Sequence, residues 1–136
     1  YEDEYSGTGT GSRPLVVSYA SSPPAEVVYA ADPATATPVS SVMNDGCFRQ
    51  VEYAGVLAGT EHPLEARAVV DWLLSPEVQA DVPLSMFVFP AVPGTPLPTV
   101  FTKYAATPEQ PATLDPALVD EKRADWLDEW DQVTFR

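Results

Sequence analysis

The sequence predicts an α/β fold in which a mixed sheet is flanked by helices. Short runs of β-branched and aromatic residues at 15–19 and 86–89 have the composition of strands. Between them, apolar residues within 64–73 recur every three or four positions, which is the spacing of an amphipathic helix. Two or three strands and three or four helices therefore follow one another in mixed order, as in α/β proteins.

The N-terminal part of the chain changes character near residue 14. The first 13 residues have the composition of a linker, because acidic residues are followed by a run of glycine, serine and threonine. The strand at 15–19 then ends in a polar turn, and Ser22 followed by Pro23 marks the start of a helix. A further strand is expected within 47–58.

Two later helix starts carry the same combination of a capping residue and proline. Ser75 is a good N-cap and Pro76 suits the first helical position, which predicts a short helix directly after the one at 64–73. Asp115 and Pro116 predict the last helix in the same way. Its apolar stripe consists of Leu118, Val119, Trp126, Leu127, Trp130 and Val133. The proline-rich stretch before Asp115 is expected to have little regular structure.

Composition and charge exclude several classes of function. Hydrophobic residues make up 45% of the 136, which suits one globular core. Acidic residues outnumber basic ones by 20 to 7 and give a net charge of −13, which argues against nucleic acid as a partner because phosphates need clustered lysine and arginine. A cationic small ligand is compatible with this charge, although acidic surfaces commonly serve solubility alone.

The residues that could support catalysis or hold a metal are few. His62 is the one histidine and Cys47 the one cysteine, so they supply no cluster with metal-ligand spacing. Nothing in their spacing requires the thiol and the imidazole to meet as a nucleophile and base. The sequence therefore predicts neither an enzyme nor a bound cofactor or metal.

A binding site is the better-supported prediction. Tyr19 ends the first strand and opens a turn in which Ser21 and Ser22 lead into a helix. This arrangement directs backbone N–H groups and serine hydroxyls to one place, which suits an anionic group. Phe87 and Phe89 alternate in the 86–89 run, so they share one face and either stack on a flat cation or pack in the core.

Several stretches of this sequence resemble a known family. They are LVVSYASSPPAEV at 15–27, CFRQVEYAGVLAGT at 47–60, VDWLLSPEVQADVPLSMFVFP at 70–90, PEQPATLDP at 108–116 and DWLDEWD at 125–131. From about Arg13 onward the chain resembles the C-terminal part of the thiamine-binding solute-binding proteins of ABC importers, especially those of actinobacteria. Such proteins resemble type II periplasmic binding proteins, in which two α/β lobes close over a ligand held in the cleft between them.

The resemblance implies a place and a partner for each part of the chain. Residues 1–13 would be a linker or crossover, and residues 14–136 would be a portion of the C-terminal lobe. The remaining N-terminal part of the protein would complete the cleft and carry an export signal or lipid anchor. The protein would then work outside the membrane, in the periplasm or at the cell surface. It would deliver thiamine or a thiamine phosphate to a membrane permease, without a cofactor.

The resemblance also implies ligand contacts at Tyr19, Ser21, Ser22 and Phe87. Tyr19 would meet the hydroxyethyl or phosphate end of the ligand, with the serine turn behind it. Phe87 falls where relatives can carry a tryptophan that lines the cleft. Some relatives carry a second tyrosine six residues after the first, and here that place is taken by Ala25.

Three alternatives remain open from the sequence. The solute could be different, such as iron, sulfate or a polyamine, although tyrosine-type iron binding needs paired tyrosines and only Tyr19 is well placed. The chain could instead be a self-contained extracellular interaction module. Two copies of it could also exchange elements to complete one another's sheet.

Overall fold

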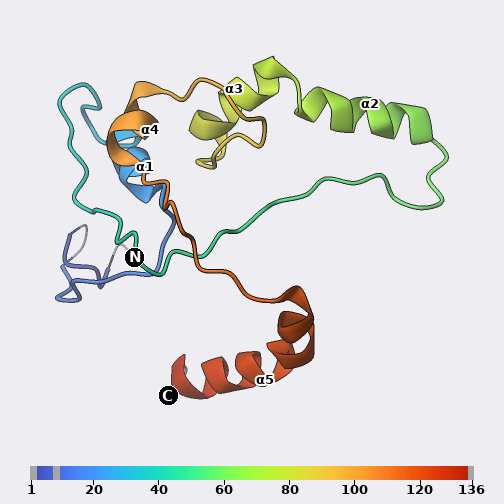
Figure 1. The fold of residues 1–136 in the computed structure, drawn as a ribbon. Coiled ribbons are helices and arrows are strands. Elements are labelled where there is room, and N and C mark those ends of the chain that lie inside the picture. The colour runs from blue at the N-terminus through green and yellow to red at the C-terminus, as the bar shows by residue number, and fades with distance from the viewer. Residues whose placement is uncertain (1–2, 8–9, 135–136) are drawn as a thin grey trace.

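The computed structural model describes residues 3–7 and 10–134, and this part of the chain is rich in helix (Figure 1). The helices within it are α1 (Ser22–Val28), α2 (Pro63–Leu73), α3 (Pro76–Ser85), α4 (Thr99–Tyr104) and α5 (Pro116–Thr134). None of these helices has the length and apolarity needed to cross a membrane.

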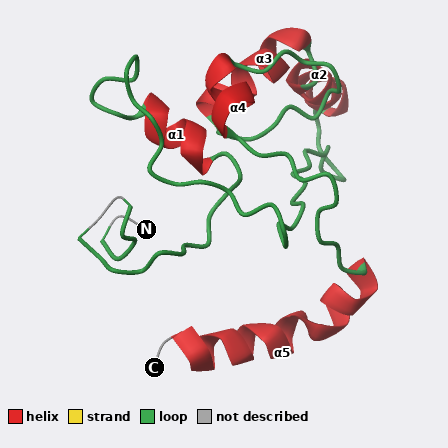
Figure 2. Cartoon of the chain, turned by 60° about the vertical axis from the view of Figure 1, so that its left-hand side comes forward, coloured by secondary structure: helices red, strands yellow, loops and turns green. Residues whose placement is uncertain are grey.

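Four of these helices, α1 to α4, lie in one part of the described structure, which we call the packed group, and α5 lies apart from them (Figure 1 and Figure 2). Helix α1 packs against α4, and α2 runs directly into α3 beside them (Figure 1). Helix α5 lies apart from the other four in both views (Figure 2). A long connection without regular secondary structure crosses the molecule before α2 (Figure 1). The packed group therefore lies around α1, α3 and α4, and it contains the segments expected to bind a ligand.

Local sequence signals explain where these helices begin. A proline occupies the first or second position of α1, α2 and α3, and Pro116 opens α5. The Ser75 hydroxyl accepts a hydrogen bond from the Val78 amide at 3.4 Å, which confirms the predicted N-cap of α3. The Asp115 carboxylate accepts one from the Ala117 amide at 2.9 Å, as expected at the start of α5.

The mixed sheet expected from the sequence is not formed among the described residues. Pairing of the β type is limited there to two isolated parallel bridges, Tyr5 with Arg13 and Phe48 with Ala112. A strand needs a neighbour for its N–H and C=O groups, and the run at 15–19 is exposed along its length, with Val17 at 95%. The run at 86–89 instead folds against the helices. The α/β class therefore stays a prediction.

Helix α4 lies in the proline-rich stretch that was expected to be irregular, so that expectation is wrong at this place. Its six residues, TVFTKY, have no amphipathic period and a β-rich composition. Tertiary packing overrides this weak local preference. The ring of Phe101, which is 1% exposed, is buried against the aromatic residues that follow α3.

The core of the packed group is a small aromatic cluster. The Phe101 ring stacks on Phe87 with centroids 6.3 Å apart and meets the edge of Phe89 at 5.7 Å. Tyr29, directly after α1, extends the cluster with its ring 5.4 Å from that of Phe87. Aromatic pairs at these separations contribute beyond the area they bury. The cluster therefore joins α1, α4 and the segment after α3.

Gln79 is a buried polar side chain that organises the same region. Its amide nitrogen donates to the Leu73 carbonyl at 2.8 Å, at the end of α2. Its amide oxygen accepts from the backbone N–H groups of Ala91 at 2.7 Å and Val92 at 3.1 Å. The Gln79 side chain thus links α3 to the end of α2 and to the loop after Phe89. It also provides hydrogen-bond partners for three backbone groups.

Much apolar surface lies outside this core. The accessible surface is 10829 Å², whereas a compact monomer of 14.7 kDa would expose about 6,900 Å². On α5, Trp126 is 39% exposed and Trp130 60% exposed, and in the connection before α2 Tyr53 is 90% exposed. The excess of about 3,900 Å² on this chain is several times the roughly 800 Å² that one partner contributes to a standard protein interface.

We predict that Gln79→Ala destabilises the packed group by about 2 kcal/mol, because three hydrogen bonds are lost and backbone groups are left without partners. Urea unfolding followed by circular dichroism would measure this change. Gln110→Ala, at an exposed position, is the matched control and should change the free energy of unfolding by less than about 0.5 kcal/mol. Equal stability of the two variants would contradict the role given to Gln79.

Candidate functional site

The structure brings two of the predicted site residues into direct contact. The hydroxyl of Ser21 donates a hydrogen bond to the backbone carbonyl of Phe87, although the two are 66 residues apart in the chain. Ser21 is 5% exposed. The turn before α1 and the segment after α3, which were selected independently from the sequence, therefore form one local structure.

Ser22 and Tyr19 lie in the same turn but face a different environment. The Ser22 hydroxyl lies 2.6 Å from the Ser18 hydroxyl and accepts a hydrogen bond from the Tyr19 amide at 3.3 Å. Ser22 is half-buried, and the Tyr19 side chain is 69% exposed. The Tyr19 side chain is thus largely open to solvent, the half-buried Ser22 hydroxyl is bonded within the turn, and the Ser21 hydroxyl is bonded inside.

The start of α1 does not offer the backbone donors that the sequence suggested for an anion. The Ser22 N–H bonds to the Tyr19 carbonyl at 3.0 Å, and the Ala25 N–H bonds to the Ser21 carbonyl at 3.3 Å. The two residues between them, Pro23 and Pro24, have no N–H. Recognition of a polar ligand at this turn therefore falls to side-chain hydroxyls.

Phe87 has an uncommon backbone conformation. Its φ angle is +53°, and among the described residues it is the one non-glycine residue with a positive φ. This left-handed conformation costs an L-residue about 1 kcal/mol or more and persists where the surroundings impose it. Here the hydrogen bond from Ser21 and the ring contacts with Tyr29 and Phe101 hold it in place.

Tyr29 is a residue of this region that sequence reasoning missed. It is the C-cap of α1, and its side chain is 77% exposed while its ring contacts Phe87. It lies seven residues after Ser22, so both fall on the same face of the helix. That spacing was available in the sequence, but its meaning depends on knowing that Phe87 packs against α1.

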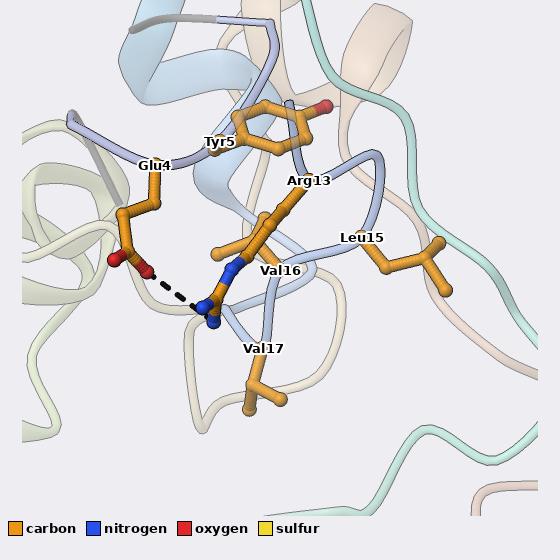
Figure 3. A pocket seen from close by; sticks show the side chains of 6 residues that line it. All are labelled: Glu4, Tyr5, Arg13, Leu15, Val16 and Val17. Atoms are coloured by element: carbon orange, nitrogen blue, oxygen red, sulfur yellow. Dashed lines mark ion pairs between the residues drawn. The ribbon is translucent and has the colours of Figure 1, made fainter. Parts of the chain in front are cut away.

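A separate hollow lies between the predicted linker and the run at 15–19. Its lining consists of Glu4, Tyr5, Arg13, Leu15, Val16 and Val17 (Figure 3). An ion pair of 3.3 Å joins the Arg13 guanidinium to the Glu4 carboxylate at one side of it (Figure 3). Both side chains are largely exposed, so this pair contributes little. The hollow contains none of the predicted site residues.

The two residues considered for nucleophilic chemistry have ordinary local roles. The Cys47 thiol donates to the Met43 carbonyl at 3.1 Å, and His62 is the exposed N-cap of α2. Within ranges 3–7 and 10–134, no group of three or more histidine, cysteine, aspartate or glutamate residues is placed to hold a metal ion.

Comparison with known proteins finds one similarity. The chain is 29% identical, over an alignment of 135 residues, to the thiamine-binding periplasmic protein of Escherichia coli (strain K12). The alignment covers 93% of this chain and 37% of that protein, so the chain spans little more than a third of its relative's length. No protein-family model matches the chain. No solved structure matches it either.

We predict that Ser21→Ala lowers the free energy of unfolding by about 1–2 kcal/mol, because the Phe87 carbonyl loses a buried donor. Chemical denaturation followed by circular dichroism is the measurement. Ser41→Ala removes the same hydroxyl from an exposed position and should be nearly neutral. Equal stability of Ser21→Ala and Ser41→Ala would show that the Ser21 hydroxyl does not hold Phe87 against α1.

Proposed function

We propose that this chain belongs to the solute-binding component of an ABC importer, which captures thiamine or a thiamine phosphate outside the membrane and delivers it to a permease. The observation that carries the proposal is the similarity to a thiamine-binding periplasmic protein over 93% of the chain. Its support from the geometry is the contact between Ser21 and Phe87, which brings two predicted parts of the site together.

The proposed site works by binding and not by catalysis. The exposed Tyr19 phenol and the Ser22 hydroxyl would receive the hydroxyethyl or phosphate end of the ligand. The Phe87 ring would supply an apolar wall. Ser21 is a positioning residue in this proposal, because its hydroxyl is already bonded to the Phe87 carbonyl. The net charge of −13 is compatible with a cationic solute and argues against nucleic acid.

The exposed apolar surface fits a larger assembly. We propose that residues 14–136 form a portion of the C-terminal lobe in a two-lobed, type II periplasmic-binding-protein fold. The N-terminal part of the same protein would then cover the connection around Tyr53 and the apolar face of α5 around Trp130. The excess of about 3,900 Å² on this chain alone is well above the roughly 800 Å² that one partner contributes to a standard interface. Unpaired runs such as 15–19 would find strand partners there.

The direct test is titration of thiamine and of its mono- and diphosphate into the full-length protein, followed by tryptophan fluorescence. We expect saturable binding in the submicromolar range. Tyr19→Ala should weaken it at least about tenfold, equivalent to about 1.4 kcal/mol, because the phenol contact is lost. Gln110→Ala, at an exposed position on a different segment, is the control and should retain wild-type affinity. A wild-type protein that responds to none of the three compounds would refute the proposed ligand.

A further inference from the structure

We propose that Tyr29 contacts the ligand and forms, with Phe87, an aromatic platform for the flat cationic ring of the solute. This inference rests on the proposed function and adds a residue that neither the predicted site nor the similarity to a relative supplies. It assigns the cationic ring of the solute to the C-terminal end of α1, at Tyr29, and the hydroxyl or phosphate end to the N-terminal end, at Ser22.

The first support is the environment of the Tyr29 ring. Its centroid lies 5.4 Å from that of Phe87 with the planes tilted by 45°, yet the Tyr29 side chain is 77% exposed. Phe87 is half-buried and stacks on Phe101 on another side. Two aromatic rings are thus held together at the surface above a buried third. Ring faces of this kind attract flat cations.

The second support is the rigidity of Phe87. The backbone of this residue is left-handed at φ +53°, and the buried Ser21 hydroxyl fixes its carbonyl. Such conformations in non-glycine residues cluster at ligand sites, where the surroundings determine them. A ring held in this way loses little freedom when a ligand stacks on it, which lowers the entropic cost of binding.

The third support is the spacing along α1. Ser22 and Tyr29 are seven residues apart, which is two helical turns, so they lie on one face about 10 Å apart. Thiamine has a flat thiazolium cation in its centre and a hydroxyethyl group, or a phosphate ester, at one end. A strip with hydroxyls at one end and rings at the other is complementary to that distribution of charge and polarity.

Variants of Tyr29 should affect the binding of thiamine and of its two phosphates alike. Tyr29→Ala should weaken thiamine, thiamine monophosphate and thiamine diphosphate by a similar factor of about ten, because all three share the cationic ring. Tyr29→Phe should stay within about twofold of the wild type, because the ring face is retained. Ser22→Ala should instead change the ratio of the affinity for thiamine to the affinities for its phosphates. Affinities of the full-length protein, measured by isothermal calorimetry, provide the readout.

A second variant separates binding from folding. Tyr29→Leu keeps apolar contact with Phe87 but removes the ring face, so it should melt like the wild type and bind as weakly as Tyr29→Ala. Gln110→Ala, at an exposed position outside the aromatic cluster, is the control and should bind like the wild type. Wild-type affinity in a folded Tyr29→Leu variant would overturn the inference while leaving the proposed function intact. Absence of binding by the wild-type protein would instead refute the proposed function itself.

Discussion

The hydrogen bond from Ser21 to the Phe87 carbonyl is the constraint on which the proposed site depends. It fastens the start of α1 to the chain that leaves α3, across 66 residues of sequence. With the Phe87 backbone fixed, its ring lies between Tyr29 and Phe101, and α4 packs on α1 through the same cluster. Gln79 provides the second fixed point, because it holds the following loop to α3.

The described structure combines a small buried core with a large exposed surface. Phe101, Pro24 and Pro83 are almost fully buried, while α5 and the connection before α2 present apolar side chains to solvent. Natural soluble proteins rarely leave such patches uncovered unless they serve as interfaces. The packed group therefore carries the proposed site, and the exposed elements carry the surface proposed as an interface.

The helix starts could be predicted because their determinants are local, as at Ser75 and Asp115, where a capping side chain precedes a proline. Whether a sheet forms could not be predicted in the same way. A run such as 15–19 has the composition of a strand, but it needs a pairing partner that the described residues do not supply. Helix α4 and the role of Tyr29 were missed for a related reason. Both depend on where the Phe87 ring packs, which is set by contacts distant in sequence. Tyr19, Ser21, Ser22 and Phe87 remain predictions as ligand contacts.

A crystal structure of the full-length protein grown with thiamine would test the central claim most directly. We expect the thiazolium ring against Tyr29 and Phe87, the hydroxyethyl group beside Tyr19 and Ser22, and the Ser21 hydroxyl still bonded to the Phe87 carbonyl. Thiamine bound away from α1, with the Tyr29 and Phe87 rings both covered by protein, would contradict the claim that this cluster forms the wall of the binding site.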